Sequence, residues 1–148
     1  MKSISGLDHI GIRVGDFRRS IEFYKTLGFE LMRSDFKERV SVLRHKAGIV
    51  LNILDSADDH SKAENILMDE DVKYSGYTHV ALRVLDIRDV IRVIDKLGYL
   101  ITEGPVTFGD GKKSIFVRDP DRNVIEFTQD TSTTVCRSNA GFESGEAL

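Results

Sequence analysis

The chain contains one segment twice. Residues 7–30 (LDHIGIRVGDFRRSIEFYKTLGFE) align without a gap with residues 77–100 (YTHVALRVLDIRDVIRVIDKLGYL), which places His9 over His79. A repeated strand and helix predicts a repeated structural module. In a chain of 148 residues, each copy has about 70 residues and supplies only half of a core, so we expect two modules in one domain.

The first copy has the pattern of a strand, a helix and three further strands. Residues 7–14 alternate between two faces, which predicts a half-buried strand. Asp16 stands where a helix N-cap is expected, and Gly28 where that helix stops. Three further strand-like runs follow, at residues 29–36, 40–46 and 48–54.

The second copy repeats this order. Asp86 is its helix cap and Gly98 its stop, and the GDGKK turn lacks the following helix of a phosphate loop, so we expect a hairpin there. The predicted strands are residues 78–85, 99–102, 113–119 and 123–129. The predicted organisation is a single domain over residues 1–130 with modules 5–55 and 76–129, a linker 56–75 and a flexible polar tail 130–148.

Composition excludes several classes of function. The net charge is -3 with dispersed basic residues, so nucleic acid is not an expected partner. No apolar run approaches the roughly 20 residues that span a bilayer, and no signal peptide pattern is present, so we expect a cytoplasmic protein without membrane contact. The single cysteine, Cys136, lies in the polar tail and is expected to be inert.

Three residues form a candidate metal-ligand set. His9 and His79 occupy equivalent positions, and a small residue, Gly11 or Ala81, follows each on the same face of its strand. Glu126 interrupts an otherwise apolar strand, where a buried carboxylate needs a partner. Two histidines and one carboxylate are the ligands of open sites for divalent first-row metals.

Further residues are placed near this set by the repeat. Asn52 occupies the position in the first copy that Glu126 occupies in the second. Arg13 and Arg83 share the histidine face and are expected either to bind an anionic substrate or to pair with acidic neighbours. The other histidines, His45 and His60, lie in charged surroundings and are predicted to face solvent.

The runs DHIGIRVGDFRRSIEFYKTLGFEL, THVALRV and FVRDPDRNVIEF resemble the vicinal oxygen chelate superfamily of glyoxalases, bleomycin-resistance proteins and extradiol dioxygenases. The resemblance implies an α+β fold of two tandem βαβββ modules, whose curved mixed sheets surround a metal-binding cavity. It assigns His9, His79 and Glu126 as metal ligands, with Glu126 also catalytic. It further implies a homodimer. Fe²⁺ or Mn²⁺ is favoured, and Zn²⁺ or Ni²⁺ is compatible.

Departures from each branch of the superfamily leave the reaction open. Glyoxalase I enzymes have a glutamate at the position of Asn52, and fosfomycin-type thiol transferases have a threonine at that of Gly11. Extradiol dioxygenases have a histidine in the region of GDGKKS and a tyrosine at the position of Phe116. The chain resembles most closely the small glyoxalase-domain-containing proteins.

We therefore expect a metal-dependent enzyme that binds a small molecule through two vicinal oxygens, with Arg13, Arg83 and Asn52 contacting the substrate. The reaction is either dioxygenase-like, which three ligands slightly favour, or lyase/isomerase-like. The alternatives are a metal-free, ligand-sequestering protein of the bleomycin-resistance type and a fosfomycin-type thiol transferase.

Overall fold

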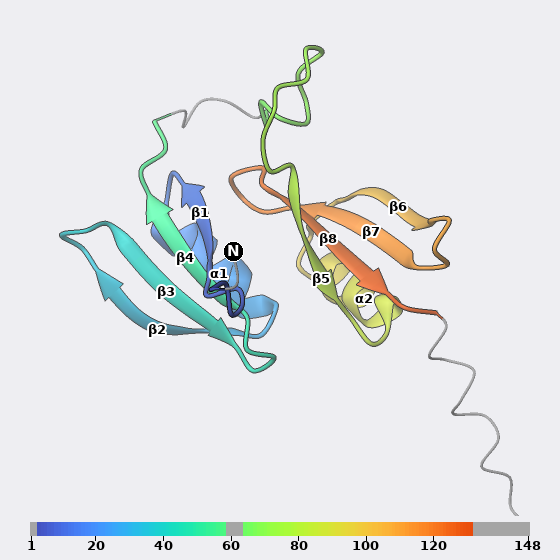
Figure 1. Ribbon diagram of the computed structural model, residues 1–148, viewed down its shortest axis with the longest axis horizontal. Coiled ribbons are helices and arrows are strands. Elements are labelled where there is room, and N and C mark those ends of the chain that lie inside the picture. The colour runs from blue at the N-terminus through green and yellow to red at the C-terminus, as the bar shows by residue number, and fades with distance from the viewer. Residues whose placement is uncertain (1–2, 59–63, 132–148) are drawn as a thin grey trace, which may run out of the picture. The chain divides into compact units, whose positions relative to one another are not determined.

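A computed structural model describes residues 3–58 and 64–131 (Figure 1). The chain forms two compact units. The first contains the described residues up to His79 together with Arg118–Val124, and the second contains Val80–Val117 and the described residues from Ile125 onward. The predicted tail falls almost entirely outside the described residues, as does His60.

The first unit has the predicted order of one strand, one helix and three strands. Its elements are β1 (Ile10–Val14), α1 (Phe17–Thr26), β2 (Phe29–Asp35), β3 (Val40–His45) and β4 (Val50–Asp55). The sheet order is β1-β4-β3-β2, with β1 parallel to β4 and the other neighbours antiparallel. Helix α1 packs on one face of this mixed sheet (Figure 1).

The second unit repeats the arrangement. Its elements are β5 (His79–Arg83), α2 (Ile87–Lys96), β6 (Ile101–Thr107), β7 (Lys113–Arg118) and β8 (Val124–Gln129), in the sheet order β5-β8-β7-β6. Only the end residues His79, Arg118 and Val124 of these strands are grouped with the first unit. β6 and β7 are antiparallel, and the turn that joins them forms the hairpin predicted at GDGKK. The expected α+β class with two βαβββ modules is confirmed. None of the described helices is long and apolar enough to cross a membrane.

The helix boundaries follow from the predicted caps. The Asp16 carboxylate accepts hydrogen bonds from the backbone N–H groups of Arg18 and Arg19, and the Asp86 carboxylate accepts one from Arg88. Gly28 and Gly98 follow the helices with φ of 88° and 72°, a conformation that glycine adopts without strain. The same local chemistry therefore begins and ends both helices.

Each unit buries the face of its sheet that lies against its helix. In β1 the buried Ile12 and Val14 alternate with the exposed Gly11 and Arg13, so one face enters the core and the other stays open. The buried apolar residues among those described are Ile12, Val14, Phe23, Tyr24, Phe29, Leu43, Leu51, Ile53 and Val124 in the first unit, and Ile87, Ile94, Ile115, Val117, Ile125 and Phe127 in the second.

The turn between β7 and β8 belongs to the first unit. Asp119, only 3% exposed, accepts a hydrogen bond from the Tyr24 hydroxyl of α1 at 2.9 Å. Asp121 accepts bonds from the Gly15 backbone N–H, the Arg19 guanidinium and the Ser20 hydroxyl at 2.8–2.9 Å. Because these partners lie about a hundred positions earlier in the chain, the turn is fixed by long-range contacts.

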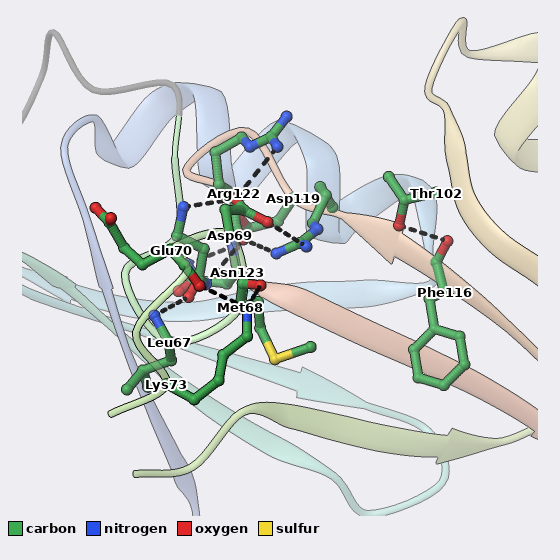
Figure 2. Close-up of polar contacts among 12 residues, drawn as sticks. Leu67, Met68, Asp69, Glu70, Lys73, Thr102, Phe116, Asp119, Arg122 and Asn123 are labelled. Atoms are coloured by element: carbon green, nitrogen blue, oxygen red, sulfur yellow. Dashed lines mark hydrogen bonds and ion pairs between the residues drawn. The ribbon is translucent and has the colours of Figure 1, made fainter. Parts of the chain in front are cut away.

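The polar segment before β5 is also attached to this turn (Figure 2). Asp69 pairs with Arg118 at 2.8 Å and with Arg122 at 3.4 Å. Burial alone would raise the pKa of Asp69, but the hydrogen bond from the Asn65 backbone and the two arginine charges outweigh it, so the pKa is lowered. The Lys73 ammonium donates to the carbonyl oxygens of Met68 and Glu70.

Candidate functional site

The open face of the second unit's sheet is hollowed into a cavity of about 400 Å³. This volume lies within the roughly 300–1,000 Å³ of small-molecule sites. Two residues predicted from the sequence, Glu126 and Arg83, line the same cavity. The complete lining is Ala81, Arg83, Phe108, Asp110, Lys112, Glu126 and Thr128.

Glu126 reaches the cavity because of strand alternation in β8. Ile125 and Phe127 enter the core on the helix side, so Glu126 and Thr128 share the opposite face. The Ser114 hydroxyl, which is fully buried in β7, donates a hydrogen bond to Oε1 of Glu126 at 2.6 Å. A half-buried carboxylate held by a neighbouring strand is an oriented acceptor for a cation or a proton.

Both predicted histidines lie at the beginning of equivalent strands. The predicted strand at residues 7–14 was too long, since β1 begins at Ile10 and His9 directly precedes it. His79 is the first residue of β5. Alternation does not distinguish a strand from an extended segment that lacks ladder hydrogen bonds, which explains the difference at His9.

The histidine rings have a similar local arrangement. Nδ1 of His9 lies 2.7 Å from a carboxylate oxygen of Asp8, and Nδ1 of His79 lies 3.0 Å from the Thr78 hydroxyl. A carboxylate can only accept, so Nδ1 of His9 donates its proton and Nε2 carries the lone pair of the neutral ring. This is the tautomer of a histidine that ligates a metal through Nε2.

The donor set fits a divalent metal ion in its chemistry. An imidazole whose Nδ1 is bonded to Asp8, a second imidazole and an oriented carboxylate are suitable ligands for such an ion. Within residues 3–58 and 64–131, no three His, Cys, Asp or Glu side chains are gathered as ligands of one ion. His9 belongs to the first unit and Glu126 to the second. Metal ligation by these residues therefore stays a prediction.

Asn52 and Arg13 lie on the open face of the first unit's sheet. Asn52 is the cross-strand partner of Gly11 in β1 and of Val42 in β3. Arg13 lies opposite Leu54, and its Nε donates to the Ser56 hydroxyl at 3.2 Å. Neither this arginine nor Arg83 forms an ion pair with an acidic residue in the described part of the chain.

Two cavity residues could not be identified from the sequence. The Thr128 hydroxyl oxygen is buried and has no hydrogen-bond partner among the described residues. An unsatisfied buried polar atom costs about 1–3 kcal/mol, so it marks a place where a ligand oxygen would be favourable. Phe108 forms an apolar wall whose ring stands edge-on to Phe116 at 6.4 Å. Sequence alone gives no signal for either, because their neighbours depend on strand pairing.

His45 was predicted to face solvent, and it is half-buried at the end of β3. Its ring packs against that of Phe29 with centroids 5.2 Å apart, and its Nδ1 accepts a hydrogen bond from the Ala47 backbone at 3.1 Å. Alternation along β3 explains the placement, because His45 follows the buried Ser41 and Leu43 at intervals of two. The side chain therefore has a structural role at the edge of the first core.

Comparison with known proteins identifies the family. The model of the glyoxalase/bleomycin resistance protein/dioxygenase superfamily matches residues 6–127. The chain belongs to this superfamily, as its sequence predicted.

Two curated relatives are named as a lactoylglutathione lyase and a probable lactoylglutathione lyase. That of Haemophilus influenzae is 33% identical over 132 residues, covering 84% of this chain and 93% of that protein. The probable lactoylglutathione lyase of Vibrio cholerae is 29% identical over 144 residues, covering 91% and 94%. Among solved structures, the fosfomycin resistance protein FosX of Listeria monocytogenes has the same fold, with a TM-score of 0.65, 20% identity and coverage of 86% and 95%.

Proposed function

We propose that the protein is a metal-dependent enzyme that acts on a small molecule bound through two vicinal oxygens. The observation that carries the proposal is the placement of Glu126, whose carboxylate lines a cavity beside Arg83 and accepts a hydrogen bond from Ser114. Enzymes of this superfamily generally use a divalent metal ion. The tautomer of His9 imposed by Asp8 supports the same assignment.

The proposed ligands are His9, His79 and Glu126, and Fe²⁺ or Mn²⁺ is the proposed ion. A bound ion would act as a Lewis acid toward negative charge that develops on substrate oxygens. Ser114 orients the Glu126 carboxylate, and Arg83 holds a positive charge within the same cavity. One curated relative is named a lactoylglutathione lyase and the other a probable one, so we favour lyase or isomerase chemistry over the dioxygenase reaction that three ligands slightly favour.

Asn52 occupies the position at which glyoxalase I enzymes have a glutamate, so we do not propose the glyoxalase I mechanism for this protein. An amide cannot accept a proton at neutral pH as a glutamate can, so it does not supply a general base. We therefore propose that the proton-transfer step differs from that of glyoxalase I enzymes. We further propose that the active form is a homodimer, as the resemblance implies.

The proposal is tested by metal content. Protein purified without chelator and without air is expected to contain close to one equivalent of iron or manganese per chain. The Glu126→Gln variant is expected to lose most of it, because an amide is a much weaker ligand than a carboxylate. Glu103→Gln, a change at an exposed glutamate of β6, is the matched control and should retain the metal.

Absence of metal from the wild type, even after reconstitution with each candidate ion, would contradict the proposal. That result would favour the ligand-sequestering alternative of the bleomycin-resistance type, which needs no ion. Metal binding that survives Glu126→Gln would reject the proposed ligand set while leaving a metalloenzyme possible.

A further inference from the structure

We infer that the cavity of the second unit selects substrates that carry an anionic group, a carboxylate above all, in addition to their vicinal oxygens, and that Arg83 and Thr128 bind this group. This inference names the substrate class and rests on the proposed function. It combines the charges in the cavity, an unsatisfied hydroxyl and the pairing of two strands.

Among the charged residues that line the cavity, Arg83 forms no ion pair with any described residue. Lys112 and Asp110 form an ion pair at 2.5 Å within the β6–β7 turn. This hydrogen bond raises the pKa of Lys112 and lowers that of Asp110, so both are charged at neutral pH. Glu126 is the proposed metal ligand. Arg83 remains as a cation that forms no ion pair in the described part of the chain.

The unsatisfied hydroxyl lies on the strand next to this cation. The Val84 backbone N–H donates to the carbonyl oxygen of Thr128 at 2.9 Å, which holds the end of β5 beside β8. Arg83 and Thr128 both line the cavity, and the Thr128 hydroxyl has no partner among the described residues. A guanidinium and a hydroxyl together can donate three hydrogen bonds to one carboxylate.

The first unit lacks this combination, although the repeat is otherwise close. The equivalent arginine, Arg13, lies opposite the apolar Leu54 and donates to Ser56. A polar partner at the Thr128 position is therefore a property of the second unit alone. Phe108 adds an apolar wall to that cavity, which suits a ligand with an apolar or aromatic body and a charged end.

Binding measurements with a matched pair of probes test the inference. Manganese-loaded, full-length protein is titrated without air with catechol and with 3,4-dihydroxybenzoate, which differ only in the carboxylate. We expect the wild type to bind the carboxylate probe at least about tenfold more tightly, the usual effect of a charge-assisted hydrogen bond. Arg83→Gln should abolish this preference, and Thr128→Val should reduce it severalfold.

Arg88→Gln is the matched control. Arg88 is an exposed arginine of α2, paired with Asp86 at 2.6 Å, and its loss should leave the preference unchanged. Equal affinity for both probes in the wild type, or a preference that survives Arg83→Gln, would overturn the inference.

Titration of the metal-free protein with benzoate distinguishes failure of the inference from failure of the proposed function. Benzoate binding that depends on Arg83, with diol binding that does not depend on metal, would reject the metal-dependent enzyme and retain the anion site. Diol binding that requires the metal but is equally tight with and without the carboxylate would retain the metal-dependent enzyme and reject the anion site. Binding of none of the probes would overturn both.

Discussion

At the scale of single residues, Asp119 and Tyr24 form a buried, hydrogen-bonded ionisable pair. Burial raises the pKa of Asp119, and the hydrogen bonds from Asn123 and Tyr24 offset this only in part. Burial also raises the pKa of Tyr24 well above its ordinary value, and the Asp119 charge adds to the effect. The tyrosine therefore stays protonated and remains a donor to the carboxylate.

Replacing Tyr24 with phenylalanine should destabilise the protein in a manner that depends on pH. The variant leaves the Asp119 carboxylate with one partner fewer, so we expect the free energy of unfolding at pH 7 to fall by about 1–3 kcal/mol. The missing bond had lowered the pKa of Asp119, so that pKa rises further in the variant. The penalty should therefore shrink as the pH falls and Asp119 becomes protonated.

Proton linkage explains why the stability penalty of the Tyr24→Phe variant shrinks as the pH falls. Because the pKa of Asp119 is higher in the folded than in the unfolded chain, the folded state binds the proton first as the pH falls. The stability contributed by Asp119 therefore grows as the pH falls through its folded pKa. The pKa of Asp69 is lowered in the folded chain, so the stability contributed by Asp69 is lost as the pH falls.

Urea unfolding of the wild type and the Tyr24→Phe variant from pH 7 to pH 4 measures the pH dependence of the penalty. Tyr77→Phe, at a residue that is 98% exposed, is the control, and a penalty that grows on acidification would contradict the prediction.

At the scale of elements, the close approach of β6 to β7 supports the cavity. Gly104 has a φ of +93°, and a Cβ added there would lie 2.5 Å from the backbone oxygen of Ser114. The register of the β6–β7 pair shifts between Ile101 and Glu103 and again between Glu103 and Val106, an interval that includes Gly104. The Ser114 hydroxyl donates a hydrogen bond to Glu126. The close packing of Gly104 against the Ser114 backbone therefore helps to position the proposed metal ligand Glu126.

Gly104→Ala should lower the free energy of unfolding by roughly 2 kcal/mol or more, because it combines a strained φ with a contact to backbone that cannot move cheaply. Gly109→Ala is the control, since nothing lies within 4 Å of a Cβ at that position. Urea unfolding followed by circular dichroism measures both. Equal stability of the two variants would show that the strand pair adjusts to the extra methyl group.

At the scale of the whole molecule, the proposed homodimer predicts that two chains together supply the ligands of one metal ion. The resemblance implies a homodimer with shared sites, and we predict complementation between two inactive variants. His9→Gln and Glu126→Gln chains, unfolded together and refolded as a mixture, should form mixed dimers in which one of the two sites has all three ligands. Random pairing would then restore about a quarter of the wild-type metal content.

Metal analysis of the mixed and the separately refolded variants provides the measurement, and sedimentation gives the oligomeric state. If sedimentation shows a dimer and the mixture recovers no metal binding, His9 and Glu126 of the same chain ligate one ion. A monomeric protein would contradict the proposed assembly.

Much of the architecture was predictable because it depends on neighbours in the sequence. The repeat, the caps Asp16 and Asp86 and the stops Gly28 and Gly98 give the order of elements, and strand alternation places Glu126 opposite the core. The start of β1 was wrong by three residues, since a ladder partner, not alternation, decides where a strand begins.

The sequence by itself determined the family, the two βαβββ modules and the candidate residues His9, His79, Glu126 and Arg83. Local periodicity, capping and repetition encode these features along the chain. Tertiary structure alone decided that Ser114 holds Glu126, that the Thr128 hydroxyl is left unsatisfied and that the Asp119 turn is anchored to α1. The physical reason is that these contacts join segments brought together by strand register and core packing, which no local pattern specifies.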